Sequence, residues 1–155
     1  MKLIPYGRQY IDKSDISAVQ KALKGELITT GQEVKKFEKL FSKVIGSKYS
    51  VSCSNGTTGI LLAYLALGIK KNDIIIMPSI NFIASMNMAH FIGAKIYLTD
   101  VNPLTGQMQP DDLKRCIKKN RLKKINTVVI MHNGGIPSDI KKFKRLKIKY
   151  KFNLI

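Results

Sequence analysis

The chain has 155 residues and a mass of 17.4 kDa, and 45% of its residues are hydrophobic and 24% charged. These proportions are typical of one folded domain and exclude wholesale disorder. The longest mostly apolar stretch, residues 59–69, is shorter than the ~17 residues that a membrane span needs, and the N-terminal sequence has no apolar segment of a secretory signal. Cys53 and Cys116 are too few for a disulfide framework or a metal site, so we expect two buried thiols in a reducing cytoplasm.

The charge is strongly basic, with 27 Lys and Arg against 10 Asp and Glu, a net of +17. A surplus of this size raises nucleic acid as a partner. Only four of the 27 basic residues are Arg, however, and Arg is the residue favoured for bidentate recognition of bases and phosphates. We therefore do not expect a nucleic-acid partner, and a basic nucleic-acid-binding domain stays as an alternative function.

The first third of the chain has helical patterns. Amphipathic helices are expected over residues 12–25 and 34–45, each ending at a glycine. A strand is expected over residues 48–53. Residues 58–67 are apolar on almost every side, which predicts a buried helix.

In the remainder, strand and helix patterns alternate. The strands are expected at residues 74–77, 95–98, 127–131 and 152–155. The helices are expected at residues 83–92 and 110–119 and, with Ser138 as its cap, up to about residue 151. Strands separated by helices of this length form βαβ units, and the continuous apolar run 74–77 is typical of a strand covered on both faces. The fold class is therefore α/β, with a parallel-dominated sheet and helices on both faces.

Residues 52–59 (SCSNGTTG) are the strongest candidate for a binding site. Small residues let a ligand approach the backbone, free N–H groups at a helix N-terminus attract anions, and Thr hydroxyls can donate to phosphate oxygens. The segment has neither the lysine of a P-loop nor the three spaced glycines of a dinucleotide site. From the residues alone, an anion-binding loop and a plain capped turn both stay open.

Other candidates follow the expected strands. Phe82 could stack on a flat ring or fill the core, and its spacing favours the core. For His132 we expect a polar contact rather than a catalytic role, and for Asp100 we expect the capping of a turn. His90 lies within an expected helix, so we expect it to have a structural role.

A family resemblance rests on six segments that occur in this order: IPYGRQYIDKSDI, LITTGQEVKKFEKLF, SCSNGTTGILLAYLALG, MPSINFIASMNMAHFIGA, DVNPLTGQM and MHNGGIPSDI. They resemble the DegT-type nucleotide-sugar aminotransferases, which are fold type I, pyridoxal-phosphate-dependent enzymes. The resemblance runs over the whole chain but covers only the first part of such an enzyme. It implies that residues 1–155 are the N-terminal part of the large domain of the fold type I aminotransferase fold, truncated at its C-terminal side.

The resemblance also implies site residues. Gly56, Thr57 and Thr58 match the segment that holds the cofactor phosphate, and Phe82 matches the aromatic position that stacks on the pyridine ring, which replaces the core interpretation. The positions that match the nucleotide-sugar site are Tyr6, Glu26, Leu27, Ile28, Thr29 and, again, Gly56. The family most often has Ala at position 56 and Ser or Ala at position 58, so this chain departs mildly from the pattern there.

The implied reaction transfers an amino group from an amino acid such as glutamate to the 4-keto carbon of a UDP-linked deoxy sugar. The implied setting is the cytoplasmic synthesis of surface-polysaccharide or flagellin-glycan sugars such as pseudaminic acid, by a homodimer with no membrane partner. In the family, the Schiff-base lysine and the Asp that pairs with the pyridine nitrogen follow the part matched here, so no catalytic residue and no activity are expected in this chain alone. A non-catalytic fragment that acts as a binding or scaffold module stays as an alternative.

Overall fold

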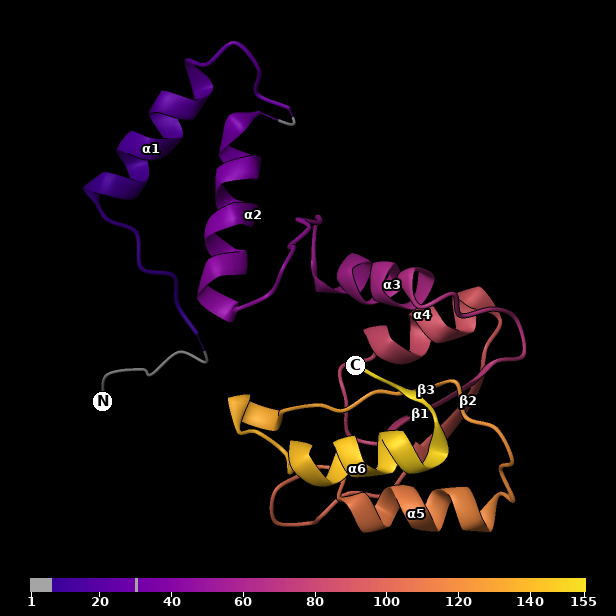
Figure 1. Ribbon diagram of the computed structural model, residues 1–155. Helices are drawn as coiled ribbons and strands as arrows, with labels where there is room; N and C mark the ends of the chain where they lie inside the picture. The colour runs from indigo at the N-terminus through magenta and orange to yellow at the C-terminus, as the bar shows by residue number, and fades with distance from the viewer. Residues whose placement is uncertain (1–6, 30) are drawn as a thin grey trace. The chain divides into compact units, whose positions relative to one another are not determined.

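The computed structural model describes residues 7–29 and 31–155 (Figure 1). The chain forms two compact units, Met1–Ser52 and Cys53–Ile155. Among the described residues, no helix is both long enough and apolar enough to cross a membrane.

The first unit contains α1 (Lys13–Leu23) and α2 (Gln32–Ile45), which confirms the two helices predicted there. The Asp12 carboxylate accepts hydrogen bonds from the backbone N–H groups of Ser14 (2.7 Å) and Asp15 (3.2 Å), which fixes the start of α1. Gly46 ends α2 in the left-handed conformation with a φ of 69°, which glycine adopts without strain.

The strand predicted over residues 48–53 is wrong, because this segment bonds to α2 instead of to another strand. The backbone N–H and the hydroxyl of Ser52 both donate to Glu38 Oε1, at 2.7 and 3.0 Å. The Ser42 hydroxyl donates to that of Ser50 at 2.9 Å. Serine side chains that offer local partners compete with strand pairing, and the apolar pattern does not register them.

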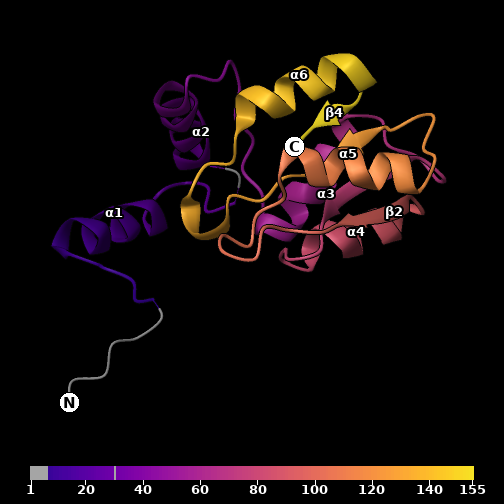
Figure 2. The ribbon, with the colours of Figure 1, turned by 90° about the horizontal axis from the view of Figure 1, so that it is seen from below.

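The second unit is an α/β layer built on four parallel strands in the order β2-β1-β3-β4. Its strands are β1 (Ile74–Pro78), β2 (Lys95–Thr99), β3 (Thr127–Val128) and β4 (Asn153–Leu154). Its helices are α3 (Gly56–Ala66), α4 (Ala84–Ile92), α5 (Pro110–Lys119), the 3-10 turn η1 (Asn133–Gly135) and α6 (Ile140–Tyr150). The predicted fold class is therefore confirmed. Figure 2 shows α6 leading directly into β4 beside the C-terminus.

Alternation along β1 supplies two cores. Ile76 packs on the face covered by α5 and α6, whereas Ile75 and Met77 pack on the face covered by α3 and α4 (Figure 1). Because both faces are covered, every one of these side chains is buried, which explains the unbroken apolar run in the sequence.

Three expectations for this unit are wrong in detail. Only Tyr64 of α3 is buried, because one side of α3 packs on the sheet and α4 while no described layer covers the other. Asp139 rather than Ser138 caps α6, since its carboxylate accepts from the Lys142 N–H at 3.1 Å. Cys116 is buried as predicted, but Cys53 is exposed because it lies in the connection that leads into α3.

Candidate functional site

The candidate site lies at the carboxyl ends of the parallel strands. β1 ends at Pro78, and the connection that follows carries Phe82 to the start of α4. α3 packs on the same face of the sheet as α4 and enters β1 through a short connection at its C-terminal end. The N-terminus of α3 therefore points toward the edge at which β1 ends, which is where ligands bind in open α/β sheets.

The start of α3 is organised by Asn55. Its side-chain Oδ1 accepts hydrogen bonds from the Thr58 N–H at 2.9 Å and from the Thr58 hydroxyl at 3.1 Å. Ser54 Oγ lies 3.1 Å from the same hydroxyl. The capped turn predicted as one alternative is therefore present, and it holds the first turn of α3 in a fixed conformation.

Two donors at this helix start stay open within the described part of the chain. The backbone N–H groups of Gly56 and Thr57 have no hydrogen-bond acceptor there, and the first turn of α3 holds no acidic residue. The positive end of the helix dipole coincides with these donors, so the turn can bind a phosphate oxygen by donating hydrogen bonds to it. A Cβ added at Gly56 would meet no atom within 4 Å, so this position also has room for the alanine common in the family.

Phe82 is 66% exposed, which shows that the core interpretation of this residue is wrong. Its ring is free of the core because α4 begins two residues later and Ala84 takes the buried position. An exposed aromatic ring beyond the end of a central strand can stack on a flat ligand.

Tyr64 joins the two helices of this region, and the sequence analysis did not single it out. Its side chain is fully buried, and its hydroxyl donates to the carbonyl oxygen of Ser85 at 3.0 Å. Burial raises the pKa of Tyr64 to about 12, so the hydroxyl keeps its proton and remains a donor at neutral pH. A single polar side chain among the apolar residues that follow the first turn of α3 is the signal that could have identified it.

The remaining candidates are two residues that follow strands and make ordinary polar contacts, and one histidine within a helix. Nδ1 of the exposed His132 accepts from the Ser138 N–H at 3.1 Å. Asp100 Oδ1 accepts from the Val101 N–H at 2.9 Å. His90 lies exposed in the last turn of α4. None of the three is brought into a cluster with another titratable group by a contact of the described residues.

Gln107 is a second residue that the sequence analysis missed. It is 5% exposed, its Nε2 donates to the Ile136 carbonyl at 2.9 Å, and its Oε1 accepts from the Ser138 hydroxyl at 2.8 Å. These two hydrogen bonds connect the turn before α5 to the loop after β3. Ser138, which was predicted as a helix cap, makes one of these bonds with its hydroxyl instead.

The substrate residues predicted in the first unit are placed only in part. Tyr6 lies outside the described residues. Residues 26–29 form the connection between α1 and α2, and Leu27 and Ile28 are 69% and 72% exposed. Glu26, Leu27 and Ile28 line a groove of about 780 Å³ between the two helices. Their roles stay predictions.

No group of three or more His, Cys, Asp or Glu side chains that could hold a metal ion occurs within residues 7–29 and 31–155.

Comparisons with known proteins identify the family of the chain. Residues 9–155 match the model of the DegT/DnrJ/EryC1/StrS aminotransferase family. The chain is 34% identical over 153 residues to the UDP-4-amino-4,6-dideoxy-N-acetyl-beta-L-altrosamine transaminase of Campylobacter jejuni, a match that covers 99% of this chain and 40% of that protein. The chain thus spans less than half the length of this relative.

Solved structures agree on the fold. An aminotransferase from Psychrobacter cryohalolentis superposes with a TM-score of 0.87 at 28% identity, over 97% of this chain and 38% of that one. The GDP-4-keto-6-deoxy-D-mannose-3-dehydratase of Escherichia coli, solved with bound hydrated pyridoxal phosphate, gives a TM-score of 0.88 at 24% identity, over 97% and 39%. With a family match over nearly the whole chain and a matching fold, the chain belongs to the DegT/DnrJ/EryC1/StrS aminotransferase family.

Proposed function

We propose that the protein to which this chain belongs transfers an amino group from an amino acid, glutamate, to the 4-keto carbon of a UDP-linked deoxy sugar. The observation that carries the proposal is the 34% identity to the altrosamine transaminase over 99% of the chain. On this proposal, residues 1–155 are the N-terminal part of the large domain, and the protein acts as a cytoplasmic homodimer.

The residues at the start of α3 fit the phosphate of pyridoxal phosphate, which supplies the electron sink for amino transfer when it is bound. The open N–H groups of Gly56 and Thr57 would donate to the phosphate oxygens, and no carboxylate in the first turn of α3 would repel them. The Thr57 hydroxyl is a further candidate donor, and the Thr58 hydroxyl would donate to the phosphate on leaving Asn55 Oδ1, to which it donates at 3.1 Å in this structure. The exposed ring of Phe82 would pack against the pyridine face and exclude water from it.

The substrate side of the proposal rests on the first unit and on Gly56. Tyr6 and residues 26–29 are proposed to contact the nucleotide sugar. The apolar side chains of Leu27 and Ile28 are exposed at the groove between α1 and α2, where they offer surface for a nucleotide or sugar ring.

A chimaera tests the proposed reaction. Residues 1–155 would replace the matched segment of the Campylobacter jejuni transaminase, and mass spectrometry would follow amination of a UDP-4-keto sugar with glutamate. We expect product, and a Phe82→Ala chimaera at least about tenfold lower in kcat/KM because ring stacking is lost. Phe91→Ala, which removes a 75% exposed phenylalanine from α4, serves as the matched control and should keep full activity. A folded chimaera that binds pyridoxal phosphate but gives no product would contradict the proposal.

A further inference from the structure

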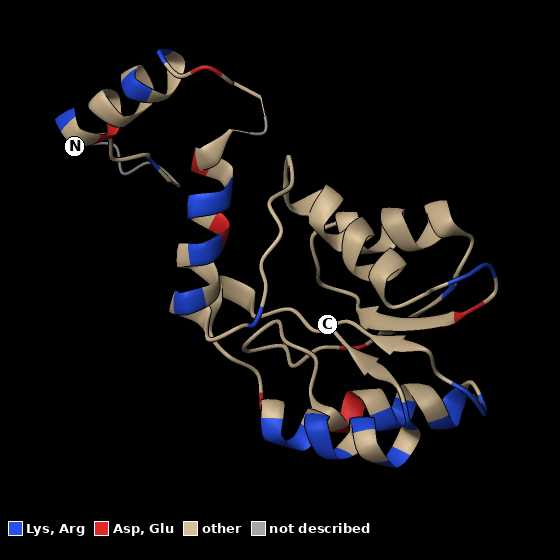
Figure 3. Ribbon diagram, turned by 45° about the horizontal axis from the view of Figure 1, so that its top comes forward, with Lys and Arg blue, Asp and Glu red and all other residues tan. Residues whose placement is uncertain are grey.

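The basic surplus of the chain is concentrated on one face of the second unit. Helices α5 and α6 carry ten Lys and Arg side chains, all of them exposed, and we refer to these as the basic face. The two helices pack on the same side of the sheet, so their cations form one surface (Figure 3). On the opposite side, α3 and α4 contain no Lys, Arg, Asp or Glu at all. The positive charge of the helices in this unit therefore lies on the side of the sheet that α5 and α6 cover.

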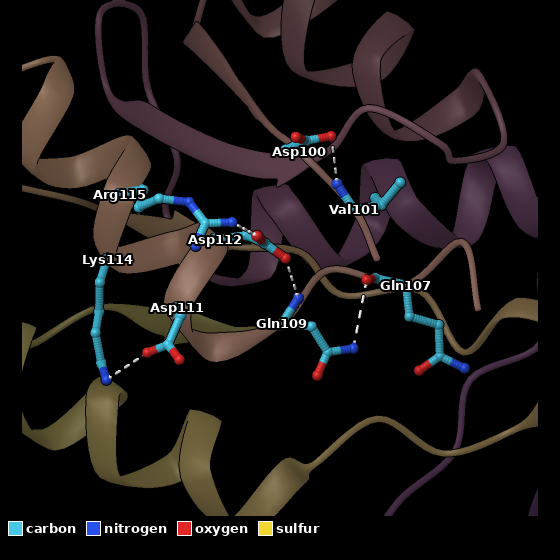
Figure 4. A network of polar contacts seen from close by, with 8 residues as sticks. All are labelled: Asp100, Val101, Gln107, Gln109, Asp111, Asp112, Lys114 and Arg115. Carbon is cyan, nitrogen blue, oxygen red and sulfur yellow. Dashed lines mark hydrogen bonds and ion pairs between the residues drawn. The ribbon is translucent and has the colours of Figure 1, made fainter. Parts of the chain in front are cut away.

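The acidic residues of this region neutralise little of that charge. Residues 111–155 contain three carboxylates, and each is paired with a cation three residues further along its own helix. Lys114 Nζ lies 2.8 Å from Asp111, Arg115 binds Asp112, and Lys142 Nζ lies 3.0 Å from Asp139 (Figure 4 for the first two). Seven cations of the basic face keep no carboxylate partner within the described residues. Their mutual repulsion favours an external polyanion.

An isoleucine lies on the exposed side of α6, in the last turn of the helix. Ile148 is 78% exposed, whereas Phe143 and Leu146 on the opposite side of the helix are buried in the core. Helical periodicity places Ile148 on the same stripe as Lys141, Lys144 and Arg145, at spacings of seven, four and three residues. This stripe thus combines three exposed cations with an exposed apolar side chain.

We propose that the basic face binds the surface of an anionic lipid bilayer, with Ile148 entering the boundary between headgroups and acyl chains. Four or more basic residues on one amphipathic helix suit attraction to anionic lipid, and α6 alone has six. Eight of the ten cations are Lys, compact charges that suit a diffuse negative surface better than bidentate recognition. A nucleic-acid backbone would leave Ile148 in water, whereas a bilayer removes it from water.

Vesicle co-sedimentation of the 155-residue chain tests this proposal. We expect binding to vesicles of phosphatidylcholine mixed with phosphatidylglycerol, little binding to phosphatidylcholine alone, and release as the salt concentration rises. The triple variant Lys141→Gln/Lys144→Gln/Arg145→Gln should bind on the order of 100-fold more weakly, since each basic residue near an anionic surface contributes about fivefold. Ile148→Ser should weaken binding about tenfold at unchanged net charge.

Matched variants separate this surface from overall charge and general hydrophobicity. Lys35→Gln/Lys39→Gln/Lys43→Gln in α2 lowers the net charge by the same three units, and Leu104→Ser removes a 93% exposed apolar side chain from a turn. Both should bind vesicles like the parent chain, and circular dichroism should show all variants folded. Equal losses in the α2 variant, an unchanged Ile148→Ser, or binding to a DNA duplex with none to the anionic vesicles would each overturn the proposal.

Discussion

The hydrogen bond from Tyr64 to the Ser85 carbonyl couples the helix that carries the candidate phosphate loop to the helix that follows Phe82. Replacing Tyr64 by Phe removes only the hydroxyl, because the ring remains in the fully buried position that the tyrosine occupies. The bond spans 3.0 Å, and its loss leaves the carbonyl with one acceptor site unused. We expect the variant to lose about 1 kcal/mol of unfolding free energy at pH 7.

This difference should vary with pH in a defined direction. Burial raises the pKa of Tyr64 from 10.0 to about 12, so the folded chain holds the phenolic proton more tightly than the unfolded chain does. The full contribution of the hydroxyl is therefore present below pH 10 and is lost as the pH rises from 10 toward 12. Between pH 9 and 11 the parent should lose about 1.4 kcal/mol relative to Tyr64→Phe. The variant should then be as stable as the parent or slightly more stable.

Denaturant titrations of both chains, followed by circular dichroism at several pH values, measure this difference. Deprotonation of the many lysines affects both chains equally, so it cancels when the two unfolding free energies are subtracted. A difference that stays constant from neutral pH to pH 11 would show that Tyr64 is not buried as a neutral donor, and the coupling of α3 to α4 would then be refuted.

Two further predictions concern ties between loops and strands. The Asn126 side chain accepts a hydrogen bond from the Ile74 N–H at 2.9 Å and donates one to Asp73 at 2.7 Å. Asn126→Ala should therefore lower the unfolding free energy, measured in a denaturant titration, by about 2 kcal/mol. A loss under about 0.5 kcal/mol would show that these bonds do not hold the start of β1. Gln107→Leu keeps the side-chain volume but removes both bonds to the loop after β3, so amide hydrogen exchange in residues 132–138 should become about tenfold faster. Unchanged exchange would mean that the loop is held by other contacts.

The elements that were predicted well are those whose apolar residues or helix-start residues mark them directly in the sequence. The run of apolar residues in β1 identified a strand covered on both faces, and α5 was predicted with its observed ends because Pro110 marks its start. The strand expected over residues 48–53 failed for a different reason. Its apolar alternation was real, but its serines bond to α2, and such tertiary hydrogen bonds leave no periodic signal.

In the candidate site, too, some features were visible in the sequence and others depended on tertiary contacts. The small residues around Gly56 indicated a helix start open to an anion, and the structure has two open N–H groups there. The spacing of Phe82 favoured the core, and only the family resemblance indicated the exposed role that its position allows. Tyr64 and Gln107 escaped notice because their importance depends on partners 21 and 29 residues away.

The most direct test of the central claim is to locate the binding site of the cofactor phosphate on the chain. Backbone amide NMR would be recorded while the isotopically labelled chain is titrated with pyridoxamine 5′-phosphate, which has no aldehyde to react with surface lysines. Inorganic phosphate and pyridoxamine serve as controls for the charge and for the ring. The account predicts saturable shifts at the amides of Gly56, Thr57 and Phe82, and smaller shifts at Gly56 and Thr57 in the Phe82→Ala variant. Shifts confined to the lysine-rich helices α5 and α6, with none at the start of α3, would contradict it.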